Sequence, residues 1–243
     1  MHGDSTGPQA APAASRRGAV PRRGAVLAPC SSWRAALLAL GLVACALLAA
    51  APSALADGAA HTWATRVVIV PGVTLCNVER RAFYKDLRTR INAALPNVEV
   101  VMKRMPDCTR ARRSYWLPFM HDELKIDNTT IIVGHSSGAV GAMRYAEDTA
   151  VAGIVLVAPC YTPMHYRKEK LSGWYDGEWQ WDKIRNNSGF IMQFSSTDDV
   201  FIPWEEHQHV ADNLHSELFK LRKGHFLIKK FPELADALIK KFQ

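Results

Sequence analysis

The alternation of short apolar runs with longer amphipathic segments is the feature that most restricts the fold of this sequence. From Arg66 onward, runs of four to seven residues rich in valine and isoleucine alternate with segments of helical periodicity. Such short runs are typical of parallel strands that helices cover on both faces. We therefore predict a doubly wound α/β fold with a mostly parallel sheet of about six strands. The strands are expected at residues 66–70, 98–102, 130–133, 151–157, 189–194 and 217–221.

Five helices are expected between and after these strands. Phe83, Leu87 and Ile91 recur at the spacing that places side chains on one helix face. The same reasoning gives helices at residues 79–94, 109–124, 136–148, 203–214 and 232–242.

One segment between the fourth and fifth predicted strands departs from this alternation. Residues 160–185 form a short aromatic insertion that holds Trp174, Trp179 and Trp181 among charged residues and glycines. The insertion follows the carboxyl end of a strand, where open α/β sheets bind ligands. Among these rings and that of Tyr175, we expect some to pack against the sheet and one or two to line a substrate pocket, with the three tryptophans as the candidates.

The first 56 residues are predicted to be a targeting leader. A basic region precedes an uncharged apolar run at residues 35–51, and Ala54-Leu55-Ala56 stands directly before Asp57. This order is typical of a secretory signal peptide and its cleavage site. We favour a cleaved signal and a protein that is secreted or enters the secretory pathway, with a membrane anchor or an organelle transit peptide as alternatives. Residues 57–243 then form one folded domain.

The distribution of charge argues against a nucleic-acid partner. The formal net charge is +7, but residues 1–56 carry five arginines and one aspartate, which accounts for more than half of it. The remaining charges are nearly balanced, and they form no basic stripe interleaved with aromatic residues.

Residues 134–138 (GHSSG) carry a G-x-S-x-G motif between a predicted strand and a predicted helix. In a sharp strand-to-helix turn the positions two before and two after the central serine approach neighbouring backbone, and Gly134 and Gly138 meet that requirement. The turn exposes the hydroxyl of Ser136, and the N–H of Ser137 points to where an oxyanion would develop. We predict Ser136 as a nucleophile and Ser137 as an oxyanion donor, and expect His135 only to pack beside the turn.

A nucleophilic serine needs a histidine base and a carboxylate that orients the base. On strand–turn–helix scaffolds of this kind the chain order is serine, acid, histidine. His225 lies in a Gly-His-Phe segment after the last predicted strand and is the expected base. Asp198 and Asp199 compete for the acid after the fifth strand. We favour Asp199, because two residues and an Ile-Pro pair follow it, and leave Asp198 to cap the loop.

A second oxyanion donor is expected from the loop after the first strand, near Gly72 and Val73. Because Pro71-Gly72 is not followed by a run of glycines, the sequence leaves the choice between these two residues open.

No metal or cofactor is expected. His207 and His209 would point to opposite faces of a helix, which makes them a poor pair of metal ligands, and with His215 they are expected to be solvated. Cys76, Cys108 and Cys160 show neither the paired spacing of a metal site nor a disulfide ladder. One bridge and three unpaired thiols both stay open.

Several segments resemble the retinoblastoma-binding protein 9 family of serine hydrolases. The matching segments are 116–120 (WLPFM), 130–147 (TIIVGHSSGAVGAMRYAE), 179–184 (WQWDKI), 193–204 (QFSSTDDVFIPW) and 224–226 (GHF). The resemblance implies a compact α/β hydrolase with its catalytic triad at Ser136, Asp199 and His225. It also implies a serine hydrolase activity with weakly defined natural substrates, tested in the family on esters and aminopeptidase-type amides.

Three departures limit this resemblance. The loop after the first strand is shorter than in the family and lacks its glycines, so the pocket and the oxyanion donor are expected to differ. The L-x-C-x-E element is absent, because residues 124–128 read LKIDN, so no retinoblastoma-type partner is expected. The leader at residues 1–56 is unlike the cytosolic or nuclear members.

The sequence therefore predicts a monomeric serine hydrolase that cleaves a small ester, thioester or amide through an acyl-enzyme. Its substrate would be a small molecule or a short acyl or peptidyl compound. The alternative is a protein that kept the hydrolase scaffold as an interaction module with little activity, since fold does not dictate function.

Overall fold

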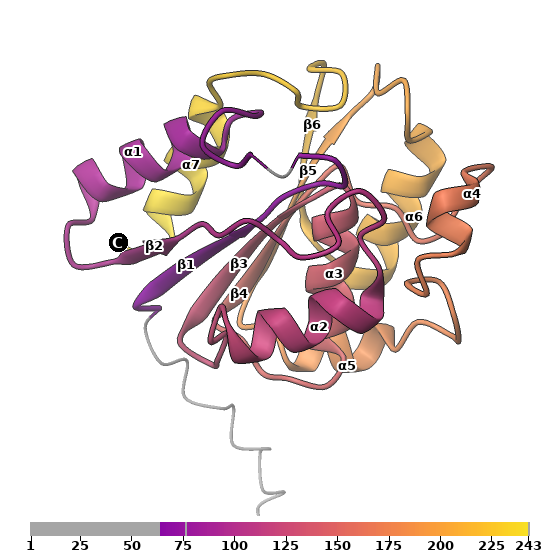
Figure 1. Ribbon diagram of the computed structural model, residues 1–243. Coiled ribbons are helices and arrows are strands. Elements are labelled where there is room, and N and C mark those ends of the chain that lie inside the picture. The colour runs from indigo at the N-terminus through magenta and orange to yellow at the C-terminus, as the bar shows by residue number, and fades with distance from the viewer. Residues whose placement is uncertain (1–63, 76, 243) are drawn as a thin grey trace, which may run out of the picture. The chain divides into compact units, whose positions relative to one another are not determined.

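The computed structural model describes residues 64–75 and 77–242, so the predicted leader lies outside the described residues. Its strands form a six-stranded sheet in the order β2-β1-β3-β4-β5-β6, and every neighbouring pair is parallel (Figure 1). The predicted doubly wound parallel sheet is confirmed. The strands are β1 (Arg66–Val70), β2 (Glu99–Val101), β3 (Thr130–His135), β4 (Gly153–Val157), β5 (Ile191–Ser196) and β6 (Glu217–Leu221).

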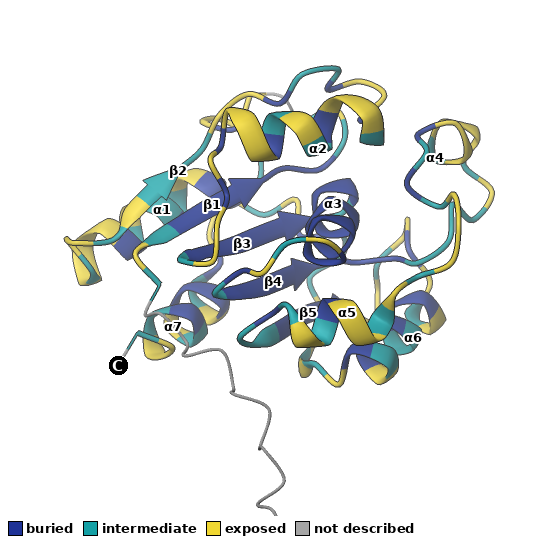
Figure 2. Ribbon diagram, turned by 90° about the horizontal axis from the view of Figure 1, so that it is seen from below, coloured by how far each residue is buried: buried dark blue, intermediate teal, exposed yellow. Residues whose placement is uncertain are grey.

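Helices cover both faces of this sheet. They are α1 (Tyr84–Ala94), α2 (Arg113–Asp122), α3 (Ser137–Ala146), α4 (Arg167–Lys170), α5 (Trp181–Asn186), α6 (Trp204–Leu214) and α7 (Pro232–Lys240). Helices α1 and α7 pack together on one face, and α3 lies on the other face with α2 and α5 beside it (Figure 1). Because both faces are covered, every residue of the central strands β3 and β4 is buried, as Figure 2 shows in dark blue.

The chain reverses its direction across the sheet between β1 and β3. From β1 it moves outward to β2, and from β3 it moves through β4, β5 and β6 toward the other edge. Right-handed crossovers therefore place α1 and α3 on opposite faces. The ends of β1 and β3 are in register, with Val70 opposite Gly134, so the loops that follow them meet at this point. Open α/β sheets bind ligands at such a reversal.

Two of the helices begin later than the sequence predicts. The first begins at Tyr84 instead of residue 79, and the second at Arg113 instead of residue 109. Shortly before these starts, Ala82 and Ala111 have φ angles of 43° and 48°. A right-handed helix excludes positive φ, so the chain turns at these residues before each helix can begin.

The aromatic insertion forms two short helices, α4 and α5, which are not among the helices predicted from the sequence. Of the cysteines in the predicted domain, Cys108 is disulfide-bonded, whereas Cys160 is free and buried.

Among residues 64–75 and 77–242, none of the helices combines the length and the hydropathy that crossing a bilayer requires.

Candidate active site

The turn between β3 and α3 has the geometry that a nucleophile elbow requires. Ser136 adopts φ 55° and ψ −121°, a conformation that side chains rarely take and that turns the chain sharply into α3. Its N–H donates to the carbonyl of Val157 at 2.8 Å, which fixes the turn to the neighbouring strand β4. A side chain at Gly134 would collide with the backbone of Gly138, and one at Gly138 would collide with the carbonyl of Val70. Both glycines are therefore required by this turn.

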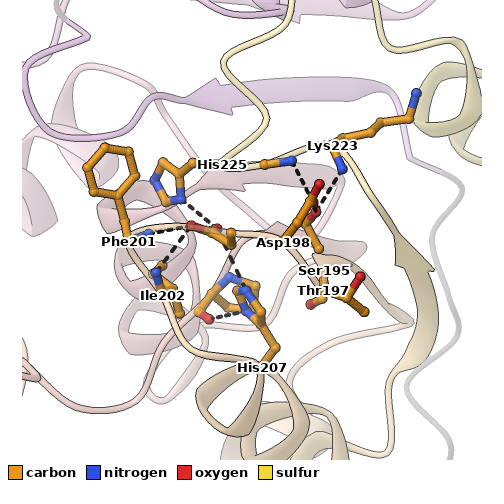
Figure 3. A network of polar contacts seen from close by, with 12 residues as sticks. Ser195, Thr197, Asp198, Phe201, Ile202, His207, Lys223 and His225 are labelled. Carbon is orange, nitrogen blue, oxygen red and sulfur yellow. Dashed lines mark hydrogen bonds and ion pairs between the residues drawn. The ribbon is translucent and has the colours of Figure 1, made fainter.

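His225 and Asp199 are brought together from two loops that are far apart in the sequence. The Nδ1–H of His225 donates to Oδ2 of Asp199 at 2.7 Å. The other carboxylate oxygen accepts the N–H groups of Phe201 at 2.9 Å and Ile202 at 3.1 Å (Figure 3). This arrangement fixes the tautomer of His225, so that Nε2 carries the free lone pair.

The pKa of Asp199 lies below its ordinary value. Burial alone would raise the pKa, since the side chain is fully buried. The imidazole of His225 and the N–H of Phe201 favour the carboxylate and outweigh burial. Asp199 is therefore an anion throughout the neutral range.

Asp198 points away from the base and stabilises the loop around it. Its Oδ1 accepts the hydroxyl of Ser196 at 2.7 Å and the N–H of Gly224 at 3.0 Å. These bonds connect the loop after β5 with the loop that carries His225. Of the two competing aspartates, the structure thus brings Asp199 to His225 and uses Asp198 as a loop cap.

Ser136 and His225 line the same cavity at the carboxyl end of the sheet. The cavity has a volume of about 260 Å³ and is also lined by Gly72, Val73 and Ser137. No hydrogen bond joins the Ser136 hydroxyl to His225 in the part of the chain that is described here. The rest of the wall is mostly apolar, with side chains such as Leu75, Met164, Phe201 and Leu227.

The structure distinguishes between the two candidates for the second oxyanion donor. The N–H of Gly72 donates to the hydroxyl of Tyr84 at 3.1 Å, so it is not available to a substrate. The N–H of Val73 makes no hydrogen bond within the described residues, and Val73 lines the cavity. On the other side, Ser137 is the first residue of α3, where backbone N–H groups have no partner inside the helix. Of the two candidates, Val73 is therefore the one whose N–H has no hydrogen-bond partner within the described residues.

The prediction that Trp174, Trp179 or Trp181 lines the pocket is wrong, since none of them borders the cavity. Trp174 is fully buried, and its indole N–H donates to the carbonyl of Ala111 at 2.6 Å. Trp179 stacks on Trp181, and the guanidinium of Arg144 lies 3.7 Å from the centre of its ring. Burial of large aromatic side chains stabilises the folded state, so the packing of these rings holds the insertion against α3.

His207 was expected to be solvated, but it is fully buried. Its Nδ1–H donates to the carbonyl of Pro159 at 2.9 Å. Its Nε2 lies 3.7 Å from Oδ2 of Asp199, and it has no hydrogen-bond partner within the described residues (Figure 3). The buried stripe of Val210, Ala211 and Leu214 along α6 includes His207, and this helical spacing was the available signal.

Glu169 is a second site residue that the motifs do not reveal. It lines the cavity, where its carboxylate accepts the hydroxyls of Ser137 and Tyr175, each at 3.2 Å. Burial raises the pKa of Glu169 above its ordinary value, although these two hydroxyls oppose the shift. Tyr175 also contacts the Sγ of Cys160 at 3.2 Å. The insertion thus contributes a polar cluster to the cavity, as its place after β4 suggested, but through residues other than the tryptophans.

Within residues 64–75 and 77–242, no group of three or more histidine, cysteine, aspartate or glutamate side chains is arranged to hold a metal ion.

Comparisons with known proteins identify the family of this chain. Residues 67–231 match the family described as serine hydrolase. Serine hydrolase RBBP9 of Rattus norvegicus is 44% identical over 171 residues, which cover 70% of this chain and 91% of the rat protein.

Solved structures show the same fold at lower identity. The ydeN gene product of B. subtilis is 22% identical, with a TM-score of 0.66 over 73% of this chain and 98% of its own. MGS-M2, an alpha/beta hydrolase enzyme from a Medee basin deep-sea metagenome library, is 15% identical, with a TM-score of 0.52 over 74% of this chain and 89% of its own. This chain therefore belongs to the serine hydrolase family, as a hydrolase with the α/β-hydrolase fold that is similar to RBBP9.

Proposed function

We propose that Ser136, His225 and Asp199 form a catalytic triad that cleaves a small ester, thioester or amide through an acyl-enzyme. The observation that carries this proposal is the 2.7 Å bond from His225 to Asp199 at a cavity that Ser136 also lines. A serine hydroxyl is a weak nucleophile unless a base accepts its proton, and the free Nε2 of His225 supplies that base.

The reaction would proceed in two halves. His225 accepts the proton of Ser136 while Oγ attacks the carbonyl carbon of the substrate, and the new imidazolium is stabilised by the Asp199 carboxylate. The tetrahedral intermediate then collapses as His225 donates the proton to the leaving group. Water, deprotonated by the same imidazole, attacks the acyl-enzyme. The bond from the acyl carbon to Oγ then breaks, the imidazolium returns its proton to Ser136, and the acid is released. The hydrogen bond between Ser136 and His225 is expected to tighten only when substrate is bound.

The N–H groups of Ser137 and Val73 would bind the oxyanion. Both border the cavity, and the Ser137 N–H also carries the partial positive charge at the start of α3. Such donors stabilise the transition state more than the ground state, because negative charge develops only as the tetrahedral intermediate forms.

The size and lining of the cavity support a small substrate. A volume of about 260 Å³ lies just below the usual range for ligand pockets, and the walls are mostly apolar. These features favour a short acyl chain or a single ring beside the scissile bond. The alternative of an interaction module without activity offers no reason for a buried carboxylate that orients a histidine toward an apolar cavity.

Replacing each of the two adjacent aspartates tests the triad. Asp199→Asn is expected to lower kcat for a p-nitrophenyl ester by about a thousandfold or more, because the amide favours the wrong tautomer of His225. Asp198→Asn is the matched control. The amide oxygen of asparagine can still accept the hydrogen bonds from Ser196 and Gly224. Because substitutions that preserve such contacts have small effects, the kcat of this variant should stay within about threefold of wild type. A large loss in the Asp198 variant with little loss in the Asp199 variant would contradict the assignment.

A further inference from the structure

A buried chain of hydrogen bonds connects the loop after β1 with the loop that carries His225. The N–H of Gly72 donates to the hydroxyl of Tyr84 at 3.1 Å, and this hydroxyl lies 2.7 Å from Nδ1 of His135. The other ring nitrogen, Nε2, lies 2.9 Å from the backbone carbonyl of His225. His135 directly precedes Ser136 in the sequence, so this series of hydrogen bonds passes through the nucleophile elbow.

The chemistry of the partners determines the direction of every bond in this chain. A backbone carbonyl can only accept, so Nε2 of His135 carries a hydrogen and donates it to His225. In the neutral ring Nδ1 then has only a lone pair, and it must accept the hydroxyl hydrogen of Tyr84. The Tyr84 oxygen accepts the N–H of Gly72 in turn. Each buried polar group in the chain therefore has a partner, and both side chains are at most 1% exposed.

At one end, the chain fixes the loop that supplies the second oxyanion donor. A Cβ added at Gly72 would lie 3.2 Å from the Cβ of Ser136, which shows how closely this loop approaches the nucleophile. The Gly72 N–H is bound to Tyr84, whereas the N–H of the next residue, Val73, which also lines the cavity, has no hydrogen-bond partner within the described residues.

At its other end, the series of hydrogen bonds fixes the loop that carries His225, whose backbone angles are unfavourable. Gly224 and Phe226, on either side of His225, have φ angles of 53° and 54°. Positive φ is costly for phenylalanine, so the surrounding structure must maintain it. Phe226 is fully buried in the aromatic cluster with Phe231, and the bond from His135 fixes the carbonyl between these two angles.

We propose that His135 and Tyr84 are positioning residues that hold the oxyanion donor of Val73 and the base His225 in fixed relation to Ser136. This inference rests on the proposed triad but adds two residues to it. Neither side chain touches the substrate. They act through the backbone of Gly72 and of His225, and so they set how well donor, base and nucleophile are aligned.

The first test removes one hydroxyl. Tyr84→Phe keeps the ring and its packing but leaves the Gly72 N–H and His135 Nδ1 without partners. The matched control is Tyr145→Phe, which removes another buried tyrosine hydroxyl, bound to the carbonyl of Ile126 at 2.9 Å at the far end of α3. For p-nitrophenyl ester hydrolysis we expect Tyr84→Phe to lower kcat roughly tenfold with KM changed less than about threefold, because the alignment matters most in the transition state. Tyr145→Phe should leave both within about twofold.

The second test replaces the imidazole. The terminal amide nitrogen of glutamine is as many bonds from Cα as Nε2 of histidine, so His135→Gln can still donate to the His225 carbonyl. His135→Leu cannot. The glutamine variant should therefore retain several times more kcat than the leucine variant. Equal losses in the two variants, or equal effects of Tyr84→Phe and Tyr145→Phe, would overturn the positioning role while leaving the triad intact.

The tautomer of His135 can be measured without any activity assay. In NMR spectra of protein with ¹⁵N-labelled histidine, the imidazole signals of His135 are those that disappear in His135→Gln. At pH 7 these signals should show a protonated Nε2 and an unprotonated Nδ1. A protonated Nδ1 would overturn the chain of bonds, because the His225 carbonyl would then have no donor. If wild type fails to turn over esters at all, the proposed triad falls and the positioning role falls with it, whereas the tautomer still decides whether the chain of bonds exists.

Discussion

At the scale of single residues, the acceptor that faces each ring determines which nitrogen of a histidine carries the hydrogen. His225 donates from Nδ1 to the Asp199 carboxylate, which leaves Nε2 free to accept a proton. His135, whose ring centre lies 5.2 Å from that of His225, has the opposite tautomer and donates from Nε2 to a carbonyl. Two neighbouring imidazoles thus have different tasks, because their surroundings differ.

The protonation of His135 predicts a dependence of stability on pH. Burial, the largest cause, and the nearby His225 lower its pKa from 6.5 to about 3, although the His225 carbonyl and Asp199 oppose the shift. Above pH 6.5 the ring is neutral in both the folded and the unfolded chain. Between pH 6.5 and pH 3 the unfolded chain binds the proton and the folded chain does not. The free energy of unfolding should therefore fall as the pH falls, by up to about 1.4 kcal/mol per pH unit.

Urea unfolding at several pH values between 6 and 4 measures this dependence. His135→Asn lacks the titrating ring, so its stability should fall less steeply than that of wild type over this range. The comparison separates His135 from the buried carboxylates, which are present in both proteins. Parallel curves for the two proteins would contradict a neutral, buried His135.

The sequence predicted residues whose roles are tied to a local motif, and it missed residues whose roles depend on tertiary contacts. Ser136 follows from the turn motif and His225 from its place after the last strand. His207 and Glu169 reach the site through α6 and the insertion. The apolar spacing of α6 indicates that position 207 is buried but not that its ring approaches Asp199, and no local pattern marks Glu169 as part of the cavity. The role of Tyr84 could not be predicted for the same reason. Tyr84 lies one residue from the periodic positions of α1, and its hydrogen-bond partner His135 is 51 residues away.

At the scale of secondary structure, the strand–turn–helix unit from β3 to α3 depends on close backbone contacts. The first turn of α3 lies against the end of β1, and the absence of a side chain at Gly138 permits this approach. The unit could be predicted from sequence because the steric requirement appears directly as two glycines at fixed spacing.

Two glycines on the same helix provide a matched test of this contact. Gly138→Ala should lower the free energy of unfolding by about 3 kcal/mol or more, because the new methyl group meets the fixed carbonyl of Val70. Gly141→Ala should be neutral or stabilising by up to about 1 kcal/mol, since its nearest neighbour is the side chain of Trp174 at 3.4 Å and alanine favours the helix. Thermal and urea unfolding measure both. Equal stabilities of the two variants would show that the close approach of α3 to β1 is absent.

The insertion between β4 and β5 was harder to predict, because aromatic composition alone does not indicate which way a ring faces. Its tryptophans were expected partly in the pocket, and the structure uses all three for packing. Arg144 on α3 forms a buried ion pair with Glu147, the C-cap residue of this helix. Arg144 also anchors the insertion, because its guanidinium donates to the carbonyls of Trp174 and Glu178. Such anchoring from another element is invisible in the local sequence.

At the scale of the whole molecule, the parallel sheet explains why residues 63 and 89 positions beyond Ser136 reach the same cavity. All six strands point the same way, so the loops after β3, β5 and β6 emerge at one edge. The sequence predicts this convergence because it follows from strand order and direction, and not from the details of packing. The detailed shape of the cavity depends instead on the loop after β1 and on the insertion.

Covalent labelling of Ser136 tests the central claim most directly. A fluorophosphonate forms a bond from its phosphorus to the activated serine oxygen and releases fluoride, so it reports an assembled site without a known substrate. We expect peptide mapping to find one phosphonate on Ser136 and none on the adjacent Ser137. Labelling should disappear in Ser136→Ala and persist in Ser188→Ala, whose buried hydroxyl has no hydrogen-bond partner within the described residues. Labelling that persists in Ser136→Ala, or a wild-type protein that stays unlabelled, would contradict the account.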